Sequence, residues 1–272
     1  MTLKKYGVLF AAGVLMVVAV GCSCKHETLA PATCTQPPTC QECGEGQGEA
    51  LGHVWKEASC TRAKTCSRCN QTEGEPLPHN RGPWVVTGVD FAADTHTEER
   101  ICKDCGQTAE TRTNQSLITE NGFAFTPKEF MIHGLDKTFR ANSLDCTAEV
   151  VSPPMGVEYA GMPDLIFIGN SDGEVMGIIN FYDSSKNEIK DSSRRGICAL
   201  EIFLPEATRK TIDECMGAVL QTLGTAETPE EAEDFYAMVR NDGYREPGVE
   251  RNGMLFRVFE TDGAAILKVN LQ

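Results

Sequence analysis

Cys34-Thr-Gln-Pro-Pro-Thr-Cys40-Gln-Glu-Cys43 and Cys60-Thr-Arg-Ala-Lys-Thr-Cys66-Ser-Arg-Cys69 are two copies of one pattern, set 26 residues apart. After each copy, nine residues lead to a histidine, which is His53 for the first copy and His79 for the second. A degenerate third copy, His96-x5-Cys102-x2-Cys105, has His where the first Cys stands in the others. Because that exchange keeps a zinc ligand but removes a disulfide partner, the pattern favours metal binding.

Structural zinc takes four Cys or His ligands in a tetrahedron, and these residues can be grouped in two ways. If each site takes the histidine that follows its cysteines, two sites form and the third lacks a ligand: Cys34, Cys40, Cys43 and His53, then Cys60, Cys66, Cys69 and His79. If each site takes the histidine that precedes them, every His and Cys from position 26 to 105 is used, so we prefer this grouping. The preferred sites are His26, Cys34, Cys40 and Cys43; His53, Cys60, Cys66 and Cys69; and His79, His96, Cys102 and Cys105.

Four filled positions leave no place for water on the metal, so the pattern predicts about three structural Zn²⁺ ions rather than catalytic ones. We expect Trp55 and Trp84 to lie over these sites. Two alternatives stay open. The eight cysteines from 34 to 105 are an even number, which disulfides in an exported protein would also satisfy. A Cys-x2-Cys pair is also a motif of thiol redox chemistry.

Further residues match between the copies: Leu51-Gly52-His53 parallels Leu77-Pro78-His79, and Ala58-Ser59-Cys60-Thr61 parallels Ala32-Thr33-Cys34-Thr35. These motifs resemble the Gly-His-x-Trp…Cys-Thr…Cys-x-x-Cys-Gly tandem repeats of bacterial secreted and surface proteins, over about a third of the chain. The resemblance implies three zinc-ribbon-like hairpin modules over residues 34–106. A unit of 26 residues buries too little apolar surface to fold alone, so a bound metal would substitute for a core.

The N-terminus has the pattern of a signal peptide. Lys4 and Lys5 precede an apolar run from Gly7 to Val20, which is too short for a transmembrane helix of about 20 residues. The run ends in Ala19-Val20-Gly21-Cys22, which resembles the lipobox of bacterial lipoproteins. The resemblance implies removal of residues 1–21, acylation of Cys22 by chains such as palmitate, an acylated stem over 22–33, and anchoring on the extracytoplasmic face of the cell membrane. An ordinary secreted protein and an uncleaved anchor stay open as alternatives.

The chain is strongly acidic, with a net charge of −14 at pH 7. Removal of residues 1–21 would take away Lys4 and Lys5 and no acidic residue, which changes −14 to −16. Such a charge argues against nucleic acid as a partner and against electrostatic docking on anionic lipid. The partners that we expect are the membrane, through the lipid anchor, and a protein, peptide or glycan ligand.

The second half of the chain has a different character. Residues 107–120 are polar and aperiodic, which predicts a linker, and residues 121–272 suffice for one ordinary domain. Thr126-Pro127-Lys128-Glu129 and Thr228-Pro229-Glu230-Glu231 are capping boxes that open helices, the second of which is expected to end at Gly243. Between them, apolar residues at helical spacing predict a long helix over 206–223.

Alternating apolar residues predict strands over 146–152, 157–160, 165–168, 174–182 and 197–204. Asn170-Ser171-Asp172-Gly173 has the composition of a turn, and Asn252-Gly253 and Asp262-Gly263 predict hairpin turns between C-terminal strands. The order of helix, strands, two helices and strands predicts an α+β fold, in which an antiparallel sheet carries helices on one face. The same order leaves an internal duplication open.

No catalytic set is recognisable in residues 121–272, where His133 is the only histidine and is expected at the surface. Cys146, Cys198 and Cys215 follow the apolar periodicity and are expected to be core thiols, with a Cys198–Cys215 disulfide as an alternative. We therefore interpret the chain as a non-catalytic surface lipoprotein whose zinc repeats carry a binding domain. Zinc storage or sensing in the envelope, and an enzyme of unrecognised type in the last domain, are the alternatives.

Overall fold

The computed structural model of the chain describes residues 25–153, 164–205, 207–242, 248–261 and 264–272. Outside these residues lie the predicted signal peptide, the acylation site, the strand over 157–160, the helix end at Gly243 and the Asp262-Gly263 turn. Within the described part, no helix is long and apolar enough to cross a membrane. The chain divides into two compact units, Met1–His79 and Asn80–Gln272.

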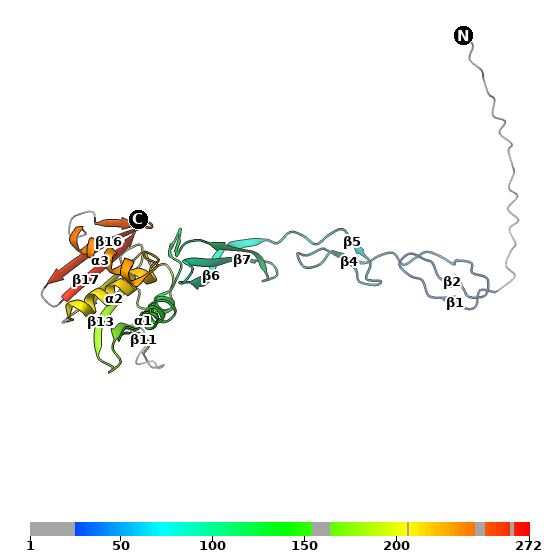
Figure 1. Cartoon of the computed structure of the whole chain (residues 1–272). Coiled ribbons are helices and arrows are strands. Elements are labelled where there is room, and N and C mark those ends of the chain that lie inside the picture. Colours follow the sequence, from blue (N-terminus) through cyan, green and yellow to red (C-terminus); the bar gives the residue numbers. More distant parts are fainter. Residues whose placement is uncertain (1–24, 154–163, 206, 243–247, 262–263) are drawn as a thin grey trace, which may run out of the picture. The chain divides into compact units, whose positions relative to one another are not determined.

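The described part of the first unit contains two small antiparallel sheets (Figure 1). In one, β1 (Leu29–Ala30) pairs with β2 (Thr39–Cys40), so the predicted stem over 22–33 contributes a strand. In the other, β4 (Lys64–Cys66) pairs with both β3 (Trp55–Lys56) and β5 (Thr72–Glu73). Among the residues of this unit that the structure describes, the buried hydrophobic side chains are three cysteines, Cys34, Cys40 and Cys66. From residue 25 to His79, the unit therefore has no aliphatic or aromatic core to hold its short strands together.

The second unit begins with a three-stranded antiparallel sheet made of β6 (Arg81–Asp90), β7 (Thr95–Cys102) and β8 (Thr108–Asn114). The linker predicted over 107–120 is therefore wrong, because β8 and β9 (Ile118–Thr119) occupy much of it. Its polar composition suggested an irregular segment, but the polar side chains of β8 bond to those of β7 across the strand pair.

The tip of the β6–β7 hairpin packs against the hydrophobic core of the C-terminal region. The Phe91 ring lies 5.4 Å from that of Phe125 and 6.3 Å from that of Phe130, measured between ring centroids. Val89 packs against the same core. The third repeat thus belongs to the same compact unit as residues 121–272, although the sequence placed it with the first two repeats.

The C-terminal sheet has seven strands in the order β11-β12-β13-β14-β17-β16-β15, and every neighbouring pair is antiparallel. A short hairpin of β9 and β10 (Gly122–Phe123) precedes it. The predicted turn from Asn170 to Gly173 is confirmed, because the Asn170 side chain accepts hydrogen bonds from the backbone N–H groups of Asp172 and Glu174. The strands are β11 (Thr147–Val151), β12 (Leu165–Gly169), β13 (Val175–Tyr182), β14 (Ala199–Leu204), β15 (Val249–Arg251), β16 (Met254–Thr261) and β17 (Ala264–Leu271).

Two of the three predicted helices begin at their capping boxes, and the long helix, predicted from residue 206, begins at Arg209. The π-helix η1 (Glu129–Leu135) runs into α1 (Asp136–Ala141), and the Thr126 and Glu129 side chains each accept the other's backbone N–H. The long helix is α2 (Arg209–Thr222). In α3 (Pro229–Asp242), the Thr228 hydroxyl accepts the N–H of Glu231. The first capping box is therefore confirmed in full. The second caps its helix through the Thr228 hydroxyl, while the Glu231 carboxylate accepts the backbone N–H of Glu227.

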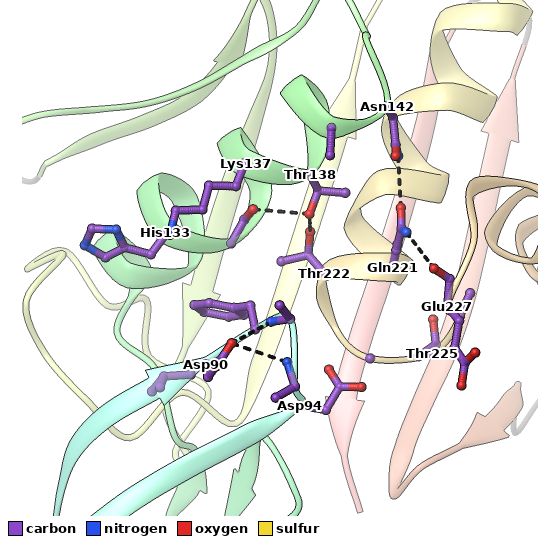
Figure 2. Close-up of a pocket in the computed structure, with 18 of the residues that line it drawn as sticks. Asp90, Asp94, His133, Lys137, Thr138, Asn142, Gln221, Thr222, Thr225 and Glu227 are labelled. Atoms are coloured by element: carbon purple, nitrogen blue, oxygen red, sulfur yellow. Dashed lines mark hydrogen bonds between the residues drawn. The ribbon is translucent and has the colours of Figure 1, made fainter.

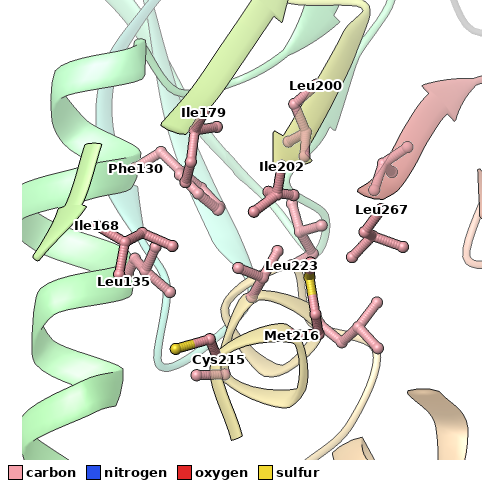
Figure 3. Packing of buried hydrophobic residues seen from close by; sticks show 14 of the residues in the cluster. Phe130, Leu135, Ile168, Ile179, Leu200, Ile202, Cys215, Met216, Leu223 and Leu267 are labelled. Carbon is pink, nitrogen blue, oxygen red and sulfur yellow. The ribbon is translucent and has the colours of Figure 1, made fainter. Parts of the chain in front are cut away.

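The helices cover one face of the C-terminal sheet, so the predicted α+β class is confirmed (Figure 1). Figure 3 shows the layer between them, in which Ile179 and Ile202 from neighbouring strands lie opposite Leu135 of η1 and Met216 of α2. The sheet order also agrees with an internal duplication. In the first half, helices η1 and α1 are followed by strands β11 to β14. In the second half, helices α2 and α3 are followed by strands β15 to β17. The last strands of the two halves, β14 and β17, pair with each other within the sheet.

Candidate metal centres

The structure gathers the Cys and His residues of the repeats into three groups whose ligand atoms lie within 4.8 Å of one another. Two of the groups have four members and one has three among the residues described. The groups are Cys34, His53, Cys66 and Cys69; Cys60, His79, Cys102 and Cys105; and His26, Cys40 and Cys43. Each group is therefore a potential metal-binding site.

These groups differ from both predicted groupings. As the preferred grouping expects, His26, His53 and His79 each join the Cys-x2-Cys pair that follows them in sequence. Both predicted groupings assign the leading cysteine to the wrong site, however. In the structure, Cys34 and Cys60 belong to the site of the next repeat and not to that of their own repeat. Each four-membered site thus combines a leading Cys with the His and the Cys-x2-Cys pair that come after it.

The Cys-x2-Cys pairs sit on turns with the same hydrogen bonds in all three repeats. In the second repeat, Cys66 N–H donates to the carbonyl of Gln71, at 2.8 Å, and Asn70 N–H donates to the carbonyl of Cys66, at 2.9 Å. The residue after the second Cys has a positive φ in each copy, 76° for Gly44, 60° for Asn70 and 72° for Gly106. Gly and Asn tolerate that conformation, so the sequence of the turn suits its shape.

Backbone hydrogen bonds explain which residues join each turn. Ser67 N–H donates to the carbonyl of Val54, at 2.8 Å, which holds the turn beside the chain next to His53. On the other side of that histidine, Gly52 N–H donates to the carbonyl of Cys34, at 3.1 Å, and so brings the leading Cys of the previous repeat to the same place. The path of the backbone, rather than proximity in sequence, selects the fourth ligand.

The first four-membered site has the dimensions of a zinc tetrahedron. The Sγ atoms of Cys34 and Cys66 lie 3.7 Å apart, and Cys69 Sγ lies 3.4 Å from His53 Nδ1. Zinc bonds of about 2.3 Å to sulfur and about 2.0 Å to nitrogen place two tetrahedral sulfurs about 3.8 Å apart, and a sulfur and a nitrogen about 3.5 Å apart. These two distances therefore match the spacing of ligands around a tetrahedral zinc ion.

The thiols of this site differ in their readiness to ionise. Burial opposes the thiolate at Cys66, but N–H groups of Arg68 and Cys69 and the His53 ring outweigh it and lower the pKa of Cys66 to about 5. Burial, followed by the hydrogen bonds and charges of the neighbouring thiols, raises the pKa of Cys34 to about 11. Without a cation, the charge on one sulfur opposes ionisation of the next, and a bound metal ion would remove that conflict.

The two tryptophans have different surroundings. Trp55 stacks on the candidate ligand His53 with a centroid distance of 4.8 Å, and Lys64 Nζ lies 5.1 Å from the centroid of the Trp55 ring. Trp84 is instead flanked by guanidinium groups, with Arg100 at 4.8 Å and Arg112 at 4.1 Å from its ring centroid. Trp55 therefore covers a candidate metal site as expected, whereas Trp84 makes cation–π contacts with two arginines of its own sheet.

His96 was predicted as a ligand, and the structure places it outside all three groups. Its Nδ1 donates to the carbonyl of Ser116, and its Nε2 accepts from the side-chain amide of Asn114, at 2.9 Å. Both ring nitrogens of this buried residue are thus hydrogen-bonded within the protein. The physical reason follows from the grouping: His96 stands at the leading position of the third repeat, and a leading residue serves the following Cys-x2-Cys pair, which the chain lacks after Cys105.

Glu98 completes the network around His96. Its carboxylate accepts from Arg112 Nε at 2.6 Å and from the Asn114 amide at 2.8 Å. Burial opposes ionisation, but these hydrogen bonds and the charge of Arg112 outweigh it and hold the pKa of Glu98 below its ordinary value. In the third repeat, a polar network and longer strands thus occupy the place of a further metal site.

The C-terminal region carries a second feature that the sequence did not predict, a cleft of about 1280 Å³ (Figure 2). The tip of the β6–β7 hairpin, from the end of β6 at Asp90 to Asp94, forms one wall. His133 and Lys137 of the η1–α1 helices and Gln221 of α2 line the rest. These residues are far apart in sequence, so only the docking of the hairpin on the helices brings them together.

Polar contacts organise the cleft. The Asn142 amide donates to Gln221 Oε1 at 2.9 Å, and Gln221 Nε2 donates to the carbonyl of Glu227 at 3.1 Å. Partial burial raises the pKa of Asp94, and the charges of Asp90 and Glu227 act in the same direction. His133 and Lys137 are exposed at the cleft edge. The cleft thus combines an acidic wall with neighbouring basic and amide groups.

Comparison of the chain with protein-family models, with curated proteins and with solved structures finds no match. The assignment of function therefore depends on the geometry of the sites and on the sequence patterns. The strongest of these observations is a set of Cys/His groups with the composition and spacing of metal sites.

Proposed function

We propose that this protein is a non-catalytic lipoprotein of the bacterial cell envelope in which zinc-stabilised repeats carry a C-terminal binding domain. The observation that carries the proposal is the group of Cys34, His53, Cys66 and Cys69, with ligand atoms within 4.8 Å of one another. Short strands without an aliphatic core need a cross-link, and three thiolates with one imidazole are a typical ligand set for structural zinc.

Zinc would act here as a structural cross-link and not as a catalyst. In the two four-membered groups, four protein ligands around a tetrahedral ion leave no position for substrate or water. Soft thiolate ligands favour zinc over calcium or magnesium, which prefer oxygen. Because Cys34 belongs to the first repeat and Cys66 and Cys69 belong to the second, an ion in their group would tie one repeat to the next.

The anchor and the location are supported by the sequence. The Ala19-Val20-Gly21-Cys22 motif after a short apolar run resembles a lipobox, and more than one acyl chain holds a protein stably on a bilayer. The acidic chain, with a net charge of −14, is unsuited to nucleic acid. We therefore propose that the protein is held by Cys22 on the extracytoplasmic face of the cell membrane.

One preparation tests the zinc and the anchor together. The full-length chain is produced in a bacterium, extracted in detergent without added metal or reductant, and measured by native mass spectrometry and thiol titration. We expect one zinc ion for each of the three groups and fatty acid on Cys22. The thiols of the repeat cysteines should react only after chelation and unfolding. Absence of both zinc and reactive thiols among the eight repeat cysteines would instead show disulfides, and a mature chain without fatty acid would contradict the anchor.

The cleft is the proposed binding surface of the C-terminal domain, with a protein, peptide or glycan as its ligand. Its concave shape and its mixture of hydrogen-bond donors and acceptors suit polar ligands of these classes. We expect Lys137→Ala and His133→Ala to weaken binding on glycan and peptide arrays at least about tenfold, which corresponds to about 1.4 kcal/mol. Lys210→Ala, on the exposed surface of α2 and outside the cleft, should bind as the unaltered protein does. Equal binding by all three variants would contradict the assignment.

A further inference from the structure

We propose that Cys146 and Cys215 form a disulfide bond that fastens the start of β11 to helix α2. Their Sγ atoms lie 3.1 Å apart, although the residues are 69 positions apart in sequence. Both side chains are buried, with 8% of Cys146 and none of Cys215 exposed. The fold therefore brings two distant thiols into direct contact inside its core.

The surroundings of this pair distinguish it from the repeat cysteines. Every Sγ in the three candidate metal groups has at least two further Cys or His ligands nearby, whereas neither Cys146 nor Cys215 belongs to any such group in the described part of the chain. Figure 3 shows Cys215 in the same apolar layer as Leu135, Met216 and Leu223. A tetrahedral metal ion needs four ligands, and this apolar layer offers only two thiols. A disulfide needs only the two sulfur atoms that are present.

The geometry also identifies the partner. The sequence left a Cys198–Cys215 disulfide open, but the thiol of Cys198 is partly exposed and lies 3.8 Å from the carbonyl of Gly196 and 4.0 Å from that of Asn121. The partner sulfur of Cys215 is that of Cys146. Oxidation of the domain should therefore consume Cys146 and Cys215 and leave Cys198 as a thiol.

The bond forms by exchange with an external disulfide, either of a small thiol such as glutathione or of a protein oxidoreductase. One cysteine of the pair loses its proton to solvent, and its thiolate attacks that disulfide, which gives a mixed disulfide and releases one external thiolate. The other cysteine then loses its proton to solvent and attacks the sulfur of the first, which releases the second external thiolate. Two protein thiols are oxidised to one disulfide, and one external disulfide is reduced to two thiols by the same two electrons.

Both sulfurs are buried in the folded domain, where an external disulfide cannot reach them. The thiolate is the reactive form of cysteine, and burial in an apolar core opposes it. The exchange therefore takes place during folding, before the two thiols are enclosed.

In the cell, the bond rests on the proposed location outside the cytoplasm, since disulfides persist in oxidising compartments. The experiment therefore supplies the oxidant directly. The full-length protein is unfolded, reduced, and refolded with zinc in a buffer of reduced and oxidised glutathione. It is then alkylated after unfolding, and proteolytic peptides are mapped by mass spectrometry without reduction. Zinc content is measured on the same sample.

We expect a Cys146 peptide joined to a Cys215 peptide, and alkylated Cys198. The Cys198→Ser variant should give the same cross-link, whereas Cys146→Ser should lose it and leave Cys215 alkylated. Reductant should lower the unfolding midpoint of the C-terminal unit in the unaltered chain and in Cys198→Ser, but not in Cys146→Ser. Alkylation of both Cys146 and Cys215 in refolded, unaltered protein, or a cross-link to Cys198, would overturn the proposal.

Failure of the proposed function is distinguishable from failure of this bond. A cross-link formed in the glutathione buffer but absent from protein isolated from cells supports the pairing and contradicts the proposed location. Loss of zinc with retention of the cross-link supports the pairing and contradicts the metal assignment. The cysteines of the repeats do not confuse the result, because each peptide is identified by its sequence.

Discussion

The Cys34→Ser/Cys66→Ser double variant is expected to lose one zinc ion per chain, whereas Cys34→Ser/Cys40→Ser is expected to lose two. Cys34 and Cys66 belong to one group in the structure, while Cys34 and Cys40 belong to two. Serine is a poor zinc ligand, so a site that loses a thiolate should release its ion. Zinc per chain, measured by elemental analysis after dialysis against a mild chelator, checks both numbers.

The two variants are matched controls for each other, because each removes two thiols. The grouping that we preferred from the sequence alone predicts the reverse result, with two ions lost from Cys34→Ser/Cys66→Ser and one from Cys34→Ser/Cys40→Ser. His96→Asn should keep every ion, since the His96 ring is bonded to Ser116 and Asn114. A zinc deficit in His96→Asn would show that the structural grouping is incorrect at the third repeat.

Phe130→Ala is expected to lower the free energy of unfolding of the C-terminal unit by about 3–5 kcal/mol, the usual cost of removing a buried phenyl ring. Phe130 is fully buried, and its ring centroid lies 5.1 Å from that of Phe125 and 5.9 Å from that of Phe181. With Phe91 on its other side, the ring joins η1 to the β6–β7 hairpin and to β13. Urea denaturation followed by circular dichroism measures the change.

Ile132→Ala is the control for this substitution. Ile132 lies two residues further along η1, and 36% of its surface is exposed, so its loss should cost less than about 1 kcal/mol. Both substitutions remove a large apolar side chain from the same helix, and the difference between them isolates burial. Equal destabilisation by the two variants would mean that Phe130 does not occupy the core position that the structure gives it.

Much of the fold could be predicted from the sequence because local rules were sufficient there. The Thr126 and Thr228 capping boxes, the α2 stripe and the alternating strands each need only residues within a few positions of one another. β8 could not be predicted, because the side chains of Arg112 and Asn114 become satisfied only across the strand pair with β7.

The sites show the same division. The Cys-x2-Cys turns and the histidines that join them could be predicted, because each histidine lies within the same short segment of chain as its turn. The leading cysteine was assigned to the wrong site because a period of 26 residues is the same whichever repeat the ligand serves. The cleft and the Cys146–Cys215 contact join segments too distant for any local pattern to reveal.

The constant period of the repeats has a consequence for how such an array changes in length. Excision of residues 54–79, one full period of 26, would leave Cys34 and His53 followed by Cys102 and Cys105, which is again a complete ligand set. Duplication of the same stretch would add one complete set. The number of repeats can therefore rise or fall during evolution through unequal recombination, and every ligand set stays complete. The length of the repeat region can change in this way without any change in the domain that follows it.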